Sequence, residues 1–177
     1  MSVTRLVVGL GNPGERYQAT RHNVGWRVLD AFAAAQGLGG WSVKQKLAAE
    51  VLAAGGLALV KPQTFMNQSG QAAGAVASYY KVPPERVLVV GDDFQLPLGT
   101  VRFRESGSSG GQKGLEDIIK HFGTSDVPRL RIGIGDPVGD PSDYVLKPFS
   151  KDQQSDLPGI ITDAVNALTE WTTGAEQ

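Results

Sequence analysis

The chain contains no cysteine, so neither a disulfide nor a thiolate contributes to its stability or its chemistry. Histidine is nearly as scarce, because His22 and His121 are the only two, and this argues against a histidine-rich metal site. No apolar run approaches the roughly 20 residues that span a bilayer, and the N-terminus lacks a basic segment followed by an apolar one. We therefore expect no membrane span and no signal peptide, and the absence of cysteine fits a cytoplasmic location.

A strong net charge of either sign is also missing. The 17 lysines and arginines nearly balance the 18 aspartates and glutamates, giving a net charge of −1. This balance argues against a protein that coats nucleic acid non-specifically. A modest local excess of basic residues remains in the segment 102–131, so a small basic patch is still possible.

The length and the alternation of elements predict one α/β domain over residues 1–177. Strands are predicted at 6–10, 47–54, 57–60, 87–90, 100–104 and 130–134, and helices at 24–36, 69–81, 115–122 and 150–172, the last interrupted near Pro158. Asn23 is predicted to cap the first helix. Gly55-Gly56 predicts a hairpin, so the expected fold is a three-layer sandwich around a twisted mixed sheet with helices on both faces.

The segment Gly9–Gly14 matches the pattern G-x-G-x-x-G, which invites a dinucleotide-binding interpretation. Such a site needs a helix that opens within the motif and an acidic residue about 20 positions later. Here the helix begins only after Asn23, and residues 33–35 are alanines inside that helix. The pattern is therefore better explained as a turn than as a pyrophosphate cradle.

His22 follows this turn and is the best candidate for a catalytic base. An unperturbed imidazole titrates near pH 6.5, about where a base is useful at neutral pH. A base needs an orienting acceptor, and Asp92 and Asp93 come at the end of the predicted strand 87–90. Because ligands of α/β folds bind at the carboxyl ends of strands, Asn12, His22 and Asp92 can converge there.

Amides and arginines provide two further candidate groups, each with a plainer alternative. Asn12 and Asn67 suit binding of a carbonyl group and stabilisation of an oxyanion, or are simply loop amides. Arg102 and Arg104 are spaced two apart, so they share one face of a strand and could bind phosphates or form a solvated surface.

Together these segments resemble the bacterial-type peptidyl-tRNA hydrolase family, and the matches run through most of the chain. The matching residues are Gly9–Gly14 with Tyr17, Thr20–Gly25, Lys61–Gly70, Asp92-Asp93 before Leu96-Pro97, Gly107–Gly111 and Arg129–Gly135. The resemblance implies a single α/β domain around a mixed sheet. It also implies hydrolysis of the ester that joins a peptide to the 3′-terminal ribose of tRNA, without a metal or a cofactor.

The resemblance also implies roles for individual residues. His22 would activate water and Asp92 would orient it. The substrate would contact Asn12, Tyr17, Met66, Asn67 and Lys113, and tRNA phosphate would contact Arg102, Arg104 and Arg131. We expect a monomer whose partner is peptidyl-tRNA, with no membrane involved.

Four positions depart from the usual family pattern: Gly91, Gln95, Gln112 and Lys113. Gln112 stands where a histidine is frequent and Lys113 where an asparagine is frequent, so an amide contact to the substrate could be replaced by a charge. These departures motivate an alternative, a non-catalytic RNA-binding protein on the same fold. Retention of His22 and Asp92 favours the hydrolase.

Overall fold

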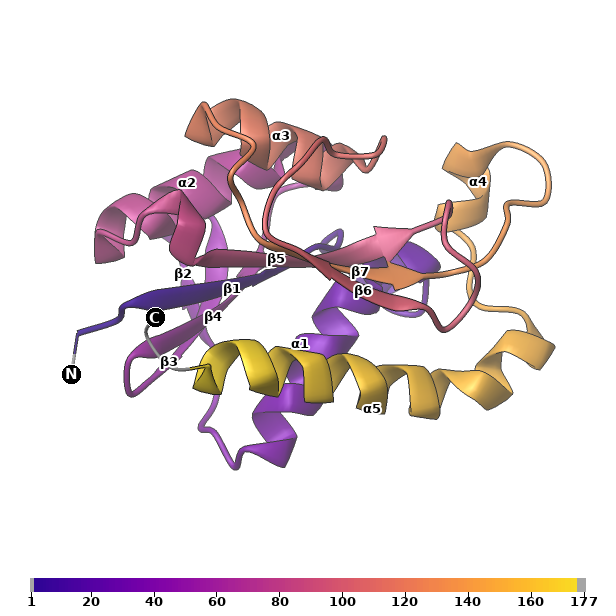
Figure 1. The fold of residues 1–177 in the computed structure, drawn as a ribbon, viewed down its shortest axis with the longest axis horizontal. Helices are drawn as coiled ribbons and strands as arrows, with labels where there is room; N and C mark the ends of the chain where they lie inside the picture. The colour runs from indigo at the N-terminus through magenta and orange to yellow at the C-terminus, as the bar shows by residue number, and fades with distance from the viewer. Residues whose placement is uncertain (1, 175–177) are drawn as a thin grey trace.

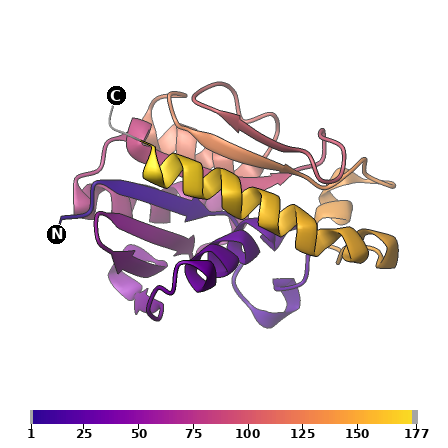
Figure 2. The same ribbon diagram turned by 60° about the horizontal axis from the view of Figure 1, so that its bottom comes forward.

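The computed structural model describes residues 2–174, in which one sheet carries all the strands (Figures 1 and 2). The strands are β1 (Arg5–Gly9), β2 (Ser42–Lys44), β3 (Ala49–Ala54), β4 (Leu57–Pro62), β5 (Val87–Asp93), β6 (Val101–Arg104) and β7 (Arg129–Gly133). Their spatial order is β2-β3-β4-β1-β5-β7-β6. The central strands β4, β1, β5 and β7 are parallel, whereas β2, β3 and β6 pair antiparallel with their neighbours. The mixed sheet is therefore confirmed.

Helices cover both faces of this sheet. They are α1 (Val24–Ala35), α2 (Ser69–Tyr80), α3 (Lys113–Phe122), α4 (Pro141–Val145) and α5 (Lys151–Thr173). Figure 1 shows α2 and α3 on one face and α1 and α5 on the other, with the short α4 beyond one end of the sheet. The predicted three-layer α/β arrangement is confirmed.

Two hydrophobic cores lie on the two faces of the sheet. Along β1, Leu6 and Val8 join the core under α2 and α3, while Val7 joins the core under α1 and α5. Because successive strand residues point to opposite faces, a central strand covered on both sides must be apolar throughout. This accounts for the continuous valine-rich runs of β1 and β5.

The predicted hairpin is confirmed, and the predicted break in the last helix is wrong. Residues 54 and 57 pair across the turn between β3 and β4. Pro158 lies inside α5, which continues from Lys151 to Thr173. A proline removes one helical hydrogen bond, but the buried residues Leu157 and Ile160 on both sides of it hold the helix against the sheet.

Two short elements were not predicted. Strand β2 is three exposed residues at the edge of the sheet, too short for an alternating pattern. Helix α4 lies in the segment 137–148, where the sequence predicts neither a strand nor a helix. It starts with Pro141 after Asp140, whose carboxylate accepts a hydrogen bond from the backbone of Ser142, a usual signal for a helix start. In residues 2–174 no helix combines the length and apolar composition that a bilayer crossing requires.

Candidate active site

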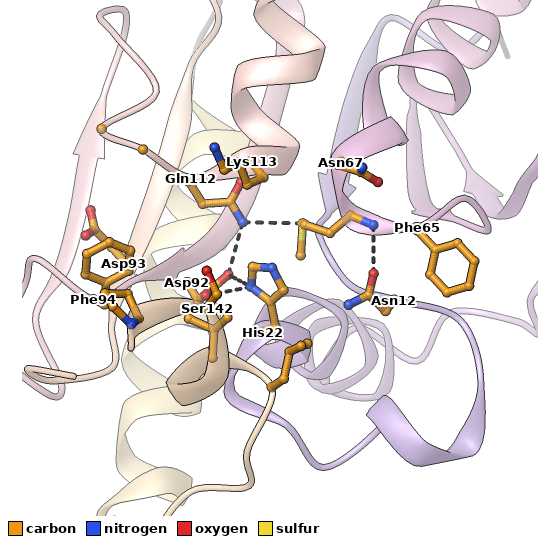
Figure 3. Close-up of a pocket in the computed structure, with 16 residues that line it drawn as sticks. Asn12, His22, Phe65, Asn67, Asp92, Asp93, Phe94, Gln112, Lys113 and Ser142 are labelled. Carbon is orange, nitrogen blue, oxygen red and sulfur yellow. Dashed lines mark hydrogen bonds and ion pairs between the residues drawn. The ribbon is translucent and has the colours of Figure 1, made fainter. Parts of the chain in front are cut away.

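A pocket of about 350 Å³ opens beyond the carboxyl ends of the central parallel strands (Figure 3). It is lined by residues from the loop after β1, the segment before α2, the end of β5, the start of α3 and helix α4. The lining residues are Asn12, His22, Phe65, Met66, Asn67, Asp92, Asp93, Phe94, Gly110, Gly111, Gln112, Lys113, Pro141, Ser142, Val145 and Leu146.

The predicted pair of His22 and Asp92 meets in this pocket. His22 Nδ1 lies 3.0 Å from Oδ1 and 2.8 Å from Oδ2 of Asp92. The His22 side chain is 11% exposed and that of Asp92 only 2%, so the carboxylate has little contact with water. An ionised carboxylate only accepts hydrogen bonds, so Nδ1 carries the proton and Nε2 keeps the lone pair. The imidazole is therefore in the tautomer that a general base requires.

Close packing of α1 brings the histidine to the carboxylate. His22 sits in a single 3-10 turn, Arg21–Asn23, directly before α1. A Cβ atom on Gly25 would lie 2.4 Å from the carbonyl oxygen of Val90 and 2.8 Å from that of Leu10. Only glycine lets the start of α1 approach β1 and β5 this closely.

Asn12 is held at a fixed orientation beside this pair. Its Oδ1 accepts a 2.7 Å hydrogen bond from the backbone N–H of Met66. Since the oxygen is committed to Met66, the Nδ2 donor faces the side on which His22 lies (Figure 3). Asn67 follows Met66 in the same turn and is an exposed residue of the pocket lining. A fixed amide donor next to a base suits a reaction in which a carbonyl oxygen gains charge.

Asn23 precedes α1 as predicted, but the prediction that its side chain caps the helix is wrong. The Asn23 amide nitrogen donates to the carbonyl oxygen of Asn12, and its Oδ1 accepts from the Asn12 backbone N–H, both at 2.9 Å. Asn23 therefore positions the backbone of Asn12. The sequence shows that Asn23 is adjacent to His22. It does not show the contact with Asn12, because an asparagine at the start of a helix more often caps that helix with its side chain.

Arg21 has no role predicted from the sequence. It joins the turn that carries His22 to the wall of the pocket formed by α4. Its buried guanidinium lies 3.7 Å above the Tyr144 ring and donates to the Tyr144 carbonyl at 2.8 Å. Two further donors reach Oε1 of Gln153, in the first turn of α5. Helix α4 lines the pocket through Val145, and Leu146 follows directly after it. The helix is therefore fixed to the residue before His22.

Tyr17 does not line the pocket but contacts a residue that does. Its ring meets Phe65 edge-on, with centroids 6.3 Å apart. Phe65 is 54% exposed and stands at the rim. Lys113 is also at the rim; its Nζ lies 3.9 Å from a carboxylate oxygen of Glu116, and both side chains are largely exposed.

The predicted phosphate-binding arginines lie on β7 and on β6, which is the edge strand of the sheet. Arg102 and Arg104 are exposed on β6, opposite Arg131 and Arg129 of β7. Arg131 forms an ion pair with Asp93. The alternation of residues 100–104 predicts a strand with one exposed face. This is wrong, because Phe103, between the two arginines, is 44% exposed.

Arg129 is a buried cation that holds the glycine-rich loop Gly107–Gly111 in place by a hydrogen bond. Its guanidinium donates to the carbonyl oxygens of Val127, Ser108 and Ser125. Burial, with smaller contributions from Arg131 and Arg104, lowers the pKa of Arg129 below its usual value. Within residues 2–174, no group of three or more acidic or histidine side chains is arranged to hold a metal ion.

A histidine held by a buried carboxylate, beside a fixed amide donor, is an arrangement that suits a hydrolase that activates water. The model of the peptidyl-tRNA hydrolase family matches residues 6–177, and the chain belongs to this family.

Relatives support the same assignment along most of their length. A peptidyl-tRNA hydrolase of Chloroflexus aggregans is 45% identical over 168 residues, covering 92% of this chain and 89% of the relative. A chloroplastic one of Arabidopsis thaliana is 44% identical over 168 residues, covering 92% of this chain and 58% of the relative. The crystal structure of the Acinetobacter baumannii peptidyl-tRNA hydrolase superposes with a TM-score of 0.89 at 34% identity, over 98% of this chain and 91% of the other.

Proposed function

We propose that this chain hydrolyses peptidyl-tRNA, with His22 as the base. The observation that carries the proposal is the hydrogen bond between His22 Nδ1 and the buried carboxylate of Asp92. It leaves Nε2 as the acceptor nitrogen in a pocket that also holds the oriented amide of Asn12.

The reaction begins when Nε2 of His22 takes a proton from water while the water oxygen attacks the ester carbonyl carbon. The carbonyl oxygen becomes negatively charged, and the amide nitrogen of Asn12 stabilises it, with Asn67 holding the substrate next to it. Asp92 stabilises the imidazolium that forms.

Collapse of the tetrahedral intermediate breaks the bond to the ribose oxygen. The imidazolium of His22 returns its proton to this oxygen, so tRNA leaves with a free 3′-hydroxyl. The peptide leaves as a carboxylic acid that keeps the second proton of the water and loses it to solvent to become a carboxylate. An ester has a good leaving group, so a base that contributes about 10²–10⁴-fold and one oriented donor suffice without a metal or a cofactor.

The tRNA lies along the basic edge of the sheet. Arg102 and Arg104 contact phosphates, and Lys113 reaches the acceptor end from the rim of the pocket. Arg131 contributes its positive charge while Asp93 holds it in place. The peptide extends past the rim, where Met66 lines the cleft and Tyr17 supports the ring of Phe65.

Release of peptide from purified peptidyl-tRNA tests the proposal. The protein should release peptide, and His22→Ala should lower kcat by about 10²-fold or more while the variant still binds tRNA. A parent protein that binds tRNA but releases no peptide would instead support the non-catalytic RNA-binding alternative, which the similarity to hydrolases does not favour.

The protein is proposed to act as a monomer in the cytoplasm, where ribosomes produce its substrate. Sedimentation of the purified chain, alone and with tRNA, tests the oligomeric state, and fractionation of the cells tests the location.

A further inference from the structure

Gln112 connects the start of α3 to the carboxylate that orients the base. Its side-chain oxygen Oε1 accepts a 2.8 Å hydrogen bond from the backbone N–H of Leu115. Gln112 thereby caps the N-terminus of α3. Its side-chain nitrogen Nε2 lies 3.1 Å from Oδ1 of Asp92 and 3.4 Å from the sulfur of Met66 (Figure 3).

The capping contact determines which way the Gln112 amide faces. The N–H of Leu115 can only donate, so the amide oxygen must face the helix and the amide nitrogen must face Asp92. The reversed amide would place two donors together at Leu115 and an oxygen against the carboxylate. Both contacts therefore favour the same orientation.

The start of α3 is itself held against the pocket. A Cβ atom on Gly114 would lie 2.6 Å from the sulfur of Met66 and 3.1 Å from the side chain of Leu10. Glycine allows this approach, so the helix that carries Gln112 is packed directly on the floor of the site.

We propose that Gln112 is a positioning residue for the hydrolysis, since its amide nitrogen fixes the carboxylate of Asp92 against His22. Both carboxylate oxygens are close to Nδ1, so the hydrogen bond to His22 alone would let the carboxylate rotate about its χ2 axis. The additional donor to Oδ1 fixes this rotation. The inference rests on the proposed function, because it assigns Gln112 a part in that same reaction.

Gln112 achieves this without adding a charge or a second titratable group. The other charged groups near the pair are accounted for: Asp93 is held by Arg131, and Lys113 lies at the rim beside Glu116. The negative charge in direct contact with the imidazole is that of Asp92.

Gln112→Glu separates the positioning role from helix capping. Glutamate keeps an oxygen for the N–H of Leu115, and a carboxylate is favourable at the start of a helix. It removes the donor to Asp92 and places a second negative charge beside it. Gln45→Glu makes the same change at an exposed position near β2, at the other side of the sheet, and serves as the matched control.

The experiment measures peptide release against pH, thermal unfolding, and the NMR titration of the two histidine rings. For Gln112→Glu we expect kcat to fall about 10-fold or more, with KM changed less than threefold. The acid limb of the kcat/KM profile and the His22 titration midpoint should both move to higher pH, because added negative charge stabilises the imidazolium. The unfolding temperature should stay close to that of Gln45→Glu.

A Gln112→Glu variant with the parent's kcat, pH profile and His22 titration would overturn the inference. So would a variant whose activity falls only in proportion to a loss of folded protein. A parent protein that releases no peptide would refute the proposed function, whereas the His22 titration would still report whether Gln112 acts on the pair.

Discussion

Asn23 and Asn12 form a reciprocal pair in which one buried side chain satisfies both backbone groups of the other residue. Asn23 donates to the carbonyl of Asn12 and accepts from its N–H, each at 2.9 Å. The side chain of Asn12 is thereby free to accept from Met66 and to present its donor to the pocket. The turn after β1 and the turn before α1 thus form one unit.

Asn23→Ala should lower both activity and stability. It leaves the N–H and C=O of Asn12 without their partners in a buried site, at a cost of about 1–3 kcal/mol in the free energy of unfolding. Displacement of the Asn12 amide should lower kcat by about 10- to 100-fold. Urea unfolding and peptide release measure the two effects.

Asn67→Ala is the control, since it removes an exposed amide and should leave the unfolding free energy within about 0.5 kcal/mol of the parent. Equal kcat values for Asn23→Ala and the parent would refute the positioning of Asn12 by Asn23.

Asp92→Asn should lower kcat by about 10²-fold or more, because a neutral amide neither fixes the Nδ1–H tautomer of His22 nor stabilises its imidazolium. Asp93→Asn, at the next position of β5, should instead act mainly by releasing Arg131, and its kcat should fall much less. Single-turnover hydrolysis compares the two variants. Similar losses in both would mean that the site requires the total charge rather than the contact with His22.

Arg21→Met should raise KM more than it lowers kcat. The substitution keeps an apolar chain against Tyr144 but removes the donors to the Tyr144 carbonyl and to Gln153, so α4 loses its side-chain contacts with the His22 turn. Loss of these hydrogen bonds from a charged group should also lower the unfolding free energy by about 1–3 kcal/mol. Steady-state kinetics and thermal unfolding test this.

Arg21→Lys provides the comparison, because lysine keeps the charge but lacks the planar set of donors. Its KM and its unfolding free energy should lie between those of the parent and those of Arg21→Met. An unchanged KM in Arg21→Met would show that the α4 wall does not contact the substrate.

Arg102→Ala and Arg104→Ala should each weaken tRNA binding and flatten its dependence on salt. Loss of one phosphate contact reduces the slope of log affinity against log salt by about one for a duplex. Filter binding of tRNA at several KCl concentrations measures the slope. Lys44→Ala, which removes an exposed cation from β2 at the opposite edge, should leave the slope unchanged.

The strands and most helices were predictable because each carries its own local signal. Buried strands such as β1 and β5 are continuous apolar runs, and the Gly55-Gly56 turn defines a hairpin. Pro158 misled the prediction because tertiary burial of α5 outweighs the local preference of proline to interrupt a helix. Strand β2 was missed because three exposed residues carry no periodic signal.

The positions of His22, Asp92 and Asn12 followed from the rule that strand ends meet at one edge of a sheet. Their partners did not follow, because a side-chain amide can bond to many groups that are distant in sequence. The sequence predicts Asn23 as a helix cap, and it shows Gln112 only as a departure from the family pattern. Arg21 and the wall formed by α4 depend on contacts across more than one hundred residues, which only the folded chain reveals.

The last wall of the pocket to be synthesised is α4, and its anchor Gln153 follows later still. A ribosome makes Asn12, His22 and Asp92 well before that wall, and until termination the growing chain is itself joined to tRNA through an ester. A growing chain therefore contains the histidine, its carboxylate and the fixed amide long before it contains the α4 wall. The pocket is closed only late in synthesis.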